Sequence, residues 1–171
     1  MRNLLLTGVS GVGKSTLLHK ISQHLSDKTI RGTYSQVIYK NNQRLGWHLE
    51  NYSGDSGLLA HVDIQSDHNM GKYGVDMDLF HRITLPQMKL DKQVYVYLID
   101  EIGIIAPWSS QFIDAMNALL NSDQRVVAIV RYKSLEYPDQ VKQRSDITLW
   151  EVTRDNREQM FYDILEWIEN T

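Results

Sequence analysis

Eight residues near the start of the chain have the types and spacing of a phosphate-binding loop. They match the pattern G-x-x-x-x-G-K-[ST] at every required position: Gly8, Val9, Ser10, Gly11, Val12, Gly13, Lys14 and Ser15. The three glycines permit positive φ angles, so the backbone N–H groups of the loop can converge on an anion. Lys14 is then expected to reach the β- and γ-phosphates of a nucleotide, and the Ser15 hydroxyl to bind Mg²⁺.

The flanking residues supply the strand and the helix that such a loop requires. An apolar run at 2–7 predicts a buried strand, and apolar residues at helical spacing between Leu17 and Leu25 predict a helix. The N-terminus of that helix adds partial positive charge for the phosphates. A simple glycine-rich turn would not need Lys14 followed by Ser15, and no third glycine completes a dinucleotide-binding pattern.

A second chemical signal is a pair of acids at the end of an apolar run. Residues 94–99 are suited to a strand buried on both faces, and Asp100 and Glu101 follow directly. Alone, this pattern also fits a strand that ends in a solvated turn. With a phosphate loop upstream it indicates a Walker B strand, in which Asp100 lies near Mg²⁺ and Glu101 orients or deprotonates the attacking water.

The composition limits the class of protein. The 171 residues are 42% hydrophobic, which predicts one domain over 1–171. The formal net charge of −3 argues against nucleic acid as the main partner. There are no cysteines, no apolar run long enough to span a bilayer and no leader-like start, so we expect a cytoplasmic protein with no membrane partner. Protein partners stay open.

The remaining pattern predicts an α/β fold, with a mostly parallel sheet covered by helices on both faces. Two β-prone runs at 33–40 and 44–52 flank the turn residues 41–43 and predict an antiparallel hairpin, within an insertion at roughly 33–74. We expect a further strand at 58–65, a loop at 66–74, and short helical turns within 75–89. Pro107 is expected to open a helix capped by Ser109 or Ser110. Two more strands are expected at 125–130 and 147–152, a short polar segment at 137–144, and a final helix after residue 156.

The chain resembles the small P-loop nucleoside-triphosphatases known from thermophiles and, in humans, as cancer-related nucleoside-triphosphatase. The resemblance covers nearly the whole chain. Beyond the phosphate loop, which is generic to a superfamily, it rests on RLGW at 44–47, GKYGVDMDLF at 71–80, LIDEIG at 98–103, Ser109 with Phe112, and VTRDNRE at 152–158.

This resemblance implies a RecA-like sheet and Mg²⁺-dependent hydrolysis of ATP, GTP and other nucleoside triphosphates to the diphosphate and phosphate. Lys14, Asp100 and Glu101 would carry the catalysis, with Ser15 and Asp100 at the metal. The implied nucleotide contacts are Gly8, Val9, Ser10, Gly11, Val12, Gly13, Lys14, Ser15, Thr16, Asp100, Glu101, Ile102 and Gly103. The family usually has Lys-Met-Glu after D-E-I-G, where this chain has Ile104, Ile105 and Ala106. If that lysine takes part, this departure predicts slower turnover or a need for another cation.

Two other functions use the same motifs. A small kinase would pass the γ-phosphate to a nucleoside, nucleotide or metabolite, with an acceptor pocket built around aromatic side chains at Tyr34, Tyr39, Trp47, Tyr52 and Tyr73, unless these only pack the strands. A nucleotide-controlled binding module would use hydrolysis only as a timer. An arginine acting on the γ-phosphate is a further expectation of this chemistry. Five arginines are candidates for that role, and Arg131 is the first to consider because it follows an apolar strand: Arg44, Arg131, Arg144, Arg154 and Arg157.

Overall fold

A mixed sheet of nine strands forms the centre of the computed structural model, which describes residues 2–171. Its strand order is β5-β6-β4-β3-β2-β7-β8-β1-β9. One half is parallel and consists of β2 (Ile30–Lys40), β7 (Val96–Ile102), β8 (Val126–Val130), β1 (Asn3–Thr7) and β9 (Ile147–Glu151). The other half is antiparallel and consists of β3 (Gln43–Asn51), β4 (Ser56–His61), β6 (Tyr73–Val75) and β5 (Asn69–Met70).

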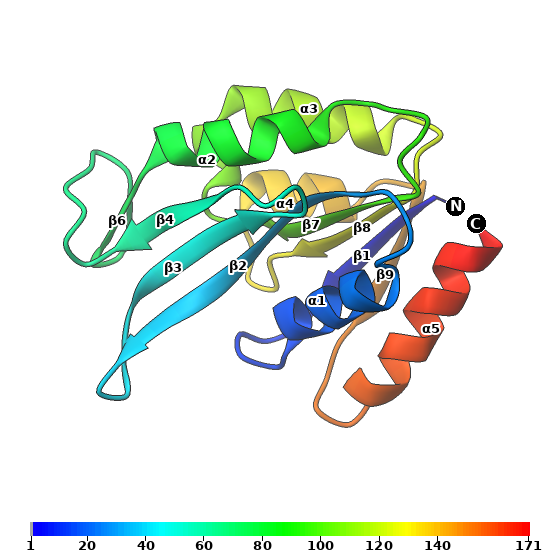
Figure 1. The fold of residues 1–171 in the computed structure, drawn as a ribbon, viewed down its shortest axis with the longest axis horizontal. Helices are drawn as coiled ribbons and strands as arrows, with labels where there is room; N and C mark the ends of the chain where they lie inside the picture. The colour runs from blue at the N-terminus through cyan, green and yellow to red at the C-terminus, as the bar shows by residue number, and fades with distance from the viewer. Residues whose placement is uncertain (1) are drawn as a thin grey trace.

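Helices cover both faces of the sheet, as Figure 1 shows. One face carries α1 (Lys14–His24) and α5 (Arg157–Asn170). The other carries α2 (Met77–Thr84), α3 (Ser110–Leu120) and α4 (Glu136–Lys142), together with the short 3₁₀ helices η1 (Leu85–Met88) and η2 (Ala106–Trp108). Within residues 2–171, no helix has both the length and the apolar character that crossing a bilayer requires.

The central parallel strands β1, β7 and β8 are mostly apolar because both of their sides are buried. On β1, Leu4 and Leu6 pack with α1 and α5, whereas Leu5 packs with the helices of the opposite face. β7 and β8 alternate in the same way, and all five residues of β8 are buried. Strands buried on both faces are typical of parallel sheets between two helix layers, so the predicted α/β class is confirmed.

The predicted hairpin is present, and its first strand has a second role. Asn41 and Asn42 have φ angles of 50° and 62°, as a two-residue hairpin turn of type I′ requires. Before the turn, β2 pairs antiparallel with β3, but its first four residues, starting at Ile30, pair parallel with β7. β2 therefore joins the parallel and antiparallel halves of the sheet.

Three segments differ from the sequence-based expectations. The predicted loop at 66–74 contains the short strands β5 and β6, because backbone pairing with β4 compensates for its polar composition. The strand expected at 58–65 ends at His61. The segment at 137–144 is largely the helix α4, where Tyr137 and Val141 supply a buried side that is too short to give a clear helical period.

The start of α3 matches the predicted capping arrangement. Pro107 lies in η2, and the Ser109 side chain accepts a hydrogen bond of 3.0 Å from the Phe112 backbone N–H. The Ser109 Oγ also lies 2.8 Å from Nε2 of His81 on α2. Ser109 is only 3% exposed, so this hydroxyl both caps α3 and ties it to α2.

We expect Ser109→Ala to lower the free energy of unfolding by about 1–2 kcal/mol, since it removes an N-cap and leaves a buried donor without its acceptor. For a chain of this length that corresponds to a fall in melting temperature of roughly 2–8 °C. Ser110→Ala is the matched control, because Ser110 is exposed at the first position of α3. Equal melting temperatures for the two variants would contradict the cap assignment.

Candidate active site

The phosphate-binding loop connects β1 to α1, as expected. Gly8, Gly11 and Gly13 have φ angles of 140°, 78° and 105°, in the region that side chains disfavour. Gly13 is also the N-cap residue of α1. Val12 is 2% exposed and packs with α1 and α5. The buried Val12 side chain therefore fixes the loop to the core while its glycines shape the backbone.

Lys14 folds back across the loop. Its Nζ donates hydrogen bonds to the carbonyl oxygens of Gly8 at 2.6 Å and Val9 at 3.0 Å. Burial lowers the pKa of Lys14, and the negative charges of Glu101 and Asp100 oppose that shift. The three charged groups are therefore close enough to interact, although they come from the beginning and the middle of the chain.

Asp100 is the buried acid of the site. It is 7% exposed, and its Oδ2 accepts 3.3 Å hydrogen bonds from the backbone N–H and the hydroxyl of Ser35 on β2. Burial raises the pKa of Asp100, while hydrogen bonding from Ser15 and Ser35 and the charge of Lys14 act in the opposite direction. An anionic oxygen with a hydroxyl from α1 beside it is a donor set of the kind that Mg²⁺ accepts.

Glu101 has the more open position of the two acids. Glu101 is an exposed residue, but partial burial of its carboxyl group among protein atoms and the negative charge of Asp100 raise the pKa of Glu101. The positive charges of Lys14 and Arg131 partly offset this rise in the pKa of Glu101. Glu101 is thus a solvent-accessible carboxylate between two cationic side chains, as a group that handles water must be.

The other expected nucleotide contacts differ in how they are exposed to the site. Thr16 is exposed on the first turn of α1, beside the loop. Ile102 is fully buried on the α3 side of the sheet, so only its backbone faces the site, and its carbonyl oxygen accepts from the Arg131 N–H at 3.1 Å. A Cβ at Gly103 would meet the Glu101 side chain at 2.3 Å, so the glycine makes room for that acid.

The structure separates the five candidate arginines. Arg144 is paired with Asp146 at 2.7 Å, and Arg44 lies over the Trp47 ring at 5.2 Å. Arg154 and Arg157 are exposed after β9, and the Arg157 side chain lies 3.7 Å from the Cβ position of Gly13. Arg131 follows β8 directly and is the one whose charge acts on Glu101.

Sequence reasoning did not connect two hydroxyl side chains with Asp100, one on β2 and one directly after β3. Ser35 donates to its carboxylate, and the buried hydroxyl of Tyr52 lies near enough for the charge of Asp100 to raise the pKa of that phenol. Neither residue belongs to a nucleotide-binding motif. Only the pairing of β2 with β7 brings them to the site, so no local sequence signal could have identified them.

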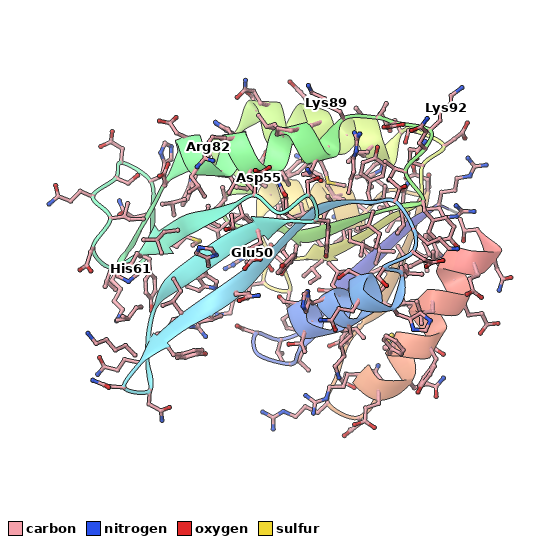
Figure 2. The ribbon with its side chains drawn as sticks, in the orientation of Figure 1. Glu50, Asp55, His61, Arg82, Lys89 and Lys92 are labelled. Atoms are coloured by element: carbon pink, nitrogen blue, oxygen red, sulfur yellow. The ribbon has the colours of Figure 1, made fainter. Side chains whose placement is uncertain are left out.

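The aromatic residues considered for an acceptor pocket do not gather in one place. Tyr34 stacks between His19 and Tyr52, with ring centroids 4.8 and 5.3 Å apart, and donates a 2.7 Å hydrogen bond to Glu50, which is labelled in Figure 2. Trp47 and Tyr73 pack against each other at 4.9 Å on the α2 side of the sheet. Trp47 and Tyr73 make contacts of strand packing, Tyr34 and Tyr52 lie toward His19 and Asp100, and Tyr39 is exposed.

Comparison with known proteins places this geometry in context. The profile of a family described as NTPase matches residues 3–165. Nucleoside-triphosphatase THEP1 of Thermotoga sp. (strain RQ2) is 29% identical over 163 residues, which cover 95% of this chain and 92% of that protein.

Two solved structures have the same fold over nearly their whole length. THEP1 of the hyperthermophile Aquifex aeolicus superimposes with a TM-score of 0.87 at 26% identity, covering 98% of this chain and 99% of the other. A human cancer-related nucleoside triphosphatase gives a TM-score of 0.83 at 28% identity, covering 100% and 99%.

We expect Gly8→Ala to disrupt the loop more than Gly11→Ala does. A Cβ at Gly8 would lie 2.4 Å from the Val152 carbonyl oxygen, whereas a Cβ at Gly11 meets nothing within 4 Å. Both variants carry the cost of a positive φ, about 1–2 kcal/mol, and Gly8→Ala adds the backbone clash. Chemical unfolding and fluorescent-nucleotide titration measure the difference; equal losses in both variants would contradict the close approach to Val152.

Proposed function

The chain belongs to the NTPase family, and from that premise we propose that it hydrolyses nucleoside triphosphates to the diphosphate and phosphate. One observation carries the proposal. The lysine of an anion-binding loop, which follows β1, interacts electrostatically with two adjacent carboxyl groups near the end of β7, a parallel strand two places away in the sheet. An anion cradle that faces a pair of acids is what phosphoanhydride hydrolysis needs: charge neutralisation on one side and water handling on the other.

We assign binding of the phosphate chain to the loop and Lys14. The loop N–H groups and the first turn of α1 would hold the phosphate oxygens. Lys14 would exchange its contacts with the Gly8 and Val9 carbonyls for the β- and γ-phosphate oxygens, which are charged and therefore stronger acceptors. Because burial disfavours the charge of Lys14, an added anion would also stabilise its protonated form.

The residues at the site fit a magnesium ion. Asp100 and the Ser15 hydroxyl are oxygen donors that interact with each other, and burial makes the Asp100 carboxylate costly without a cation. Within residues 2–171 no cluster of three or more metal-binding side chains exists, so most ligands of the ion would be phosphate oxygens and water. When bound, Mg²⁺ would neutralise charge on the β- and γ-phosphates.

Glu101 is our candidate for activation of water. A water held by its carboxylate would attack the γ-phosphorus and pass one proton to Glu101, while the bond from the γ-phosphorus to the β–γ bridging oxygen breaks. The nucleoside diphosphate leaves with that oxygen. The raised pKa of Glu101 improves it as a proton acceptor, and the positive charges of Lys14 and Arg131 favour its ionised form.

The assigned contacts involve phosphates and metal, and for this reason we propose acceptance of ATP, GTP and other nucleoside triphosphates. A kinase would use the same loop and acids, so the test must separate transfer to water from transfer to an acceptor. A nucleotide-timed binding module would show negligible free turnover.

We expect the wild-type protein to release phosphate from several nucleoside triphosphates with Mg²⁺ and without any acceptor, and to lose this activity with EDTA.

Lys14→Ala should weaken nucleotide binding and turnover together, because it removes the loop's cation. Phosphate release over a panel of triphosphates, with and without added nucleosides and nucleotides, measures both. Activity that depends strictly on an acceptor would replace the hydrolase with a kinase, and full activity in Lys14→Ala would remove the loop from the mechanism.

Glu101→Gln should lower kcat by about 10²–10⁴-fold while nucleotide affinity changes little, because the amide cannot accept the water's proton. Asp67→Asn is a suitable control, since Asp67 lies in the segment before β5. Steady-state kinetics and titration with a fluorescent nucleotide separate the two effects. A Glu101→Gln protein as fast as wild type would falsify the role in water activation.

A further inference from the structure

We propose that Arg131 is a catalytic arginine supplied within the chain itself, and that it contacts the γ-phosphoryl group as charge develops during hydrolysis. The assignment rests on the proposed function and deepens it, by stating that the site needs no arginine from a partner. It follows from the order and register of three strands and from the contacts of the candidate arginines.

The sheet places Arg131 between the two halves of the site. β8 lies directly between β1, which leads into the phosphate loop, and β7, which ends in the acids. Because all three strands are parallel, their carboxyl ends meet at one edge of the sheet. Arg131 is the first residue beyond β8, so its side chain leaves the sheet at the centre of this edge.

The register fixes its level within the site. Leu6 is opposite Ile129, and extending this pairing by two residues puts Arg131 level with Gly8, the first residue of the loop. On the other side, the Arg131 N–H donates to the Ile102 carbonyl oxygen at 3.1 Å, just after the acids. The Arg131 backbone is therefore bonded to the end of β7 and lies level with the start of the phosphate loop.

The alternation of β8 indicates which face the side chain takes. Val127 and Ile129 pack on the α1 side of the sheet, whereas Val126, Ala128 and Val130 pack on the α3 side. The next residue in this alternation, Arg131, falls on the α1 side, where the phosphate loop begins its helix. Its charge also acts on Glu101, in agreement with this position.

Among the described residues, the fold does not pair the Arg131 guanidinium with a carboxylate. Its Nε is buried without a hydrogen-bond partner, and within residues 2–171 no carboxylate forms a salt bridge with it. A buried N–H without an acceptor is costly, and a guanidinium without a salt-bridge partner matches an oxyanion with several acceptor oxygens. The transferring phosphoryl group is the oxyanion that this site handles.

The other arginines fit this role less well. Arg144 is neutralised by Asp146 and Arg31 by Asp91. Arg82 lies on α2 in the helix layer opposite α1, as Figure 2 shows. Arg157 lies over Gly13 at the start of α1, and its charge is not among those that shift the pKa of Asp100 or Glu101.

Arg125 provides a matched control on the same strand. It immediately precedes β8, at the opposite edge of the sheet from Arg131, and its Nε is also buried without a partner. Its NH1 donates to the Tyr95 carbonyl oxygen at 3.3 Å, and its guanidinium lies 5.0 Å from the centre of the Tyr95 ring. Arg125→Met therefore removes a comparable side chain without touching the phosphate edge.

We expect Arg131→Met to lower kcat by about 10³-fold or more, within the range known for arginines that stabilise phosphoryl transfer. It should bind a nonhydrolysable ATP analogue nearly as well as wild type but lose tight binding of ADP with aluminium fluoride and Mg²⁺, which mimics the transition state. Arg125→Met should retain kcat and both affinities. Specific activity of the wild type should not rise with protein concentration.

Arg131→Lys is a second, more conservative variant in case Arg131→Met does not fold. Thermal unfolding of Arg131→Met and Arg131→Lys detects any folding defect. Arg131→Lys keeps the charge but loses the forked geometry of the guanidinium. We expect it to lower kcat by at least about 10-fold, which corresponds to a loss of about 1.4 kcal/mol in transition-state stabilisation. Full kcat in either variant, or equal losses of both analogues, would overturn the assignment. Specific activity that rises with protein concentration would place the arginine in a second copy and also overturn it.

The same experiment separates this assignment from the proposed function. If wild-type protein released no phosphate but bound ADP with aluminium fluoride and Mg²⁺ through Arg131, the hydrolase would be rejected and the arginine contact kept. If wild type released phosphate and Arg131→Met bound that mimic equally well, the hydrolase would stand and the arginine assignment would fall.

Discussion

Parallel pairing of β1, β8 and β7 is the constraint on which the rest of the structure depends. The loop with Lys14 and the acids Asp100 and Glu101 are separated by more than half of the chain, and each alone is only a local pattern. They meet because parallel strands present their carboxyl ends at one edge of the sheet. The apolar sides of these three strands are buried by helices on both faces, so the edge is held by the whole core.

Without a ligand, placing these charges together at the edge of the sheet costs free energy. Burial disfavours the ionised form of Lys14, Asp100 and Glu101. Lys14 is stabilised by the charges of both acids and each acid by the charge of Lys14, whereas the negative charge of Asp100 further disfavours ionised Glu101. A triphosphate with a divalent cation brings both signs of charge into the site, which relieves these costs together. The electrostatics that make the site expensive to fold therefore favour the ligand that it is proposed to bind.

The antiparallel half of the sheet contributes to the site through β2. This strand pairs with β7 at its start and with β3 further on, and Ser35, just beyond the part paired with β7, donates to the Asp100 carboxylate. Tyr34 and Tyr52 continue the contact toward His19 on α1. The strands that follow the first helix thus form one wall of the acidic site, and β2 is a structural part of the parallel sheet as well as of the hairpin.

The sequence alone determined the features that depend on neighbouring residues. These are the loop glycines and Lys14, the apolar run ending in Asp100 and Glu101, the turn within 41–43, and a serine cap at Ser109 or Ser110, of which the structure selects Ser109. Each is set by backbone conformation or by a hydrogen bond within a few positions. Only the tertiary structure decided which polar groups lie beside the acids, that β5 and β6 are strands, and that Arg131, already the first candidate from its place after an apolar strand, lies between the loop and the acids. Those outcomes depend on strand order and on register between distant segments, and no local pattern of residues encodes them.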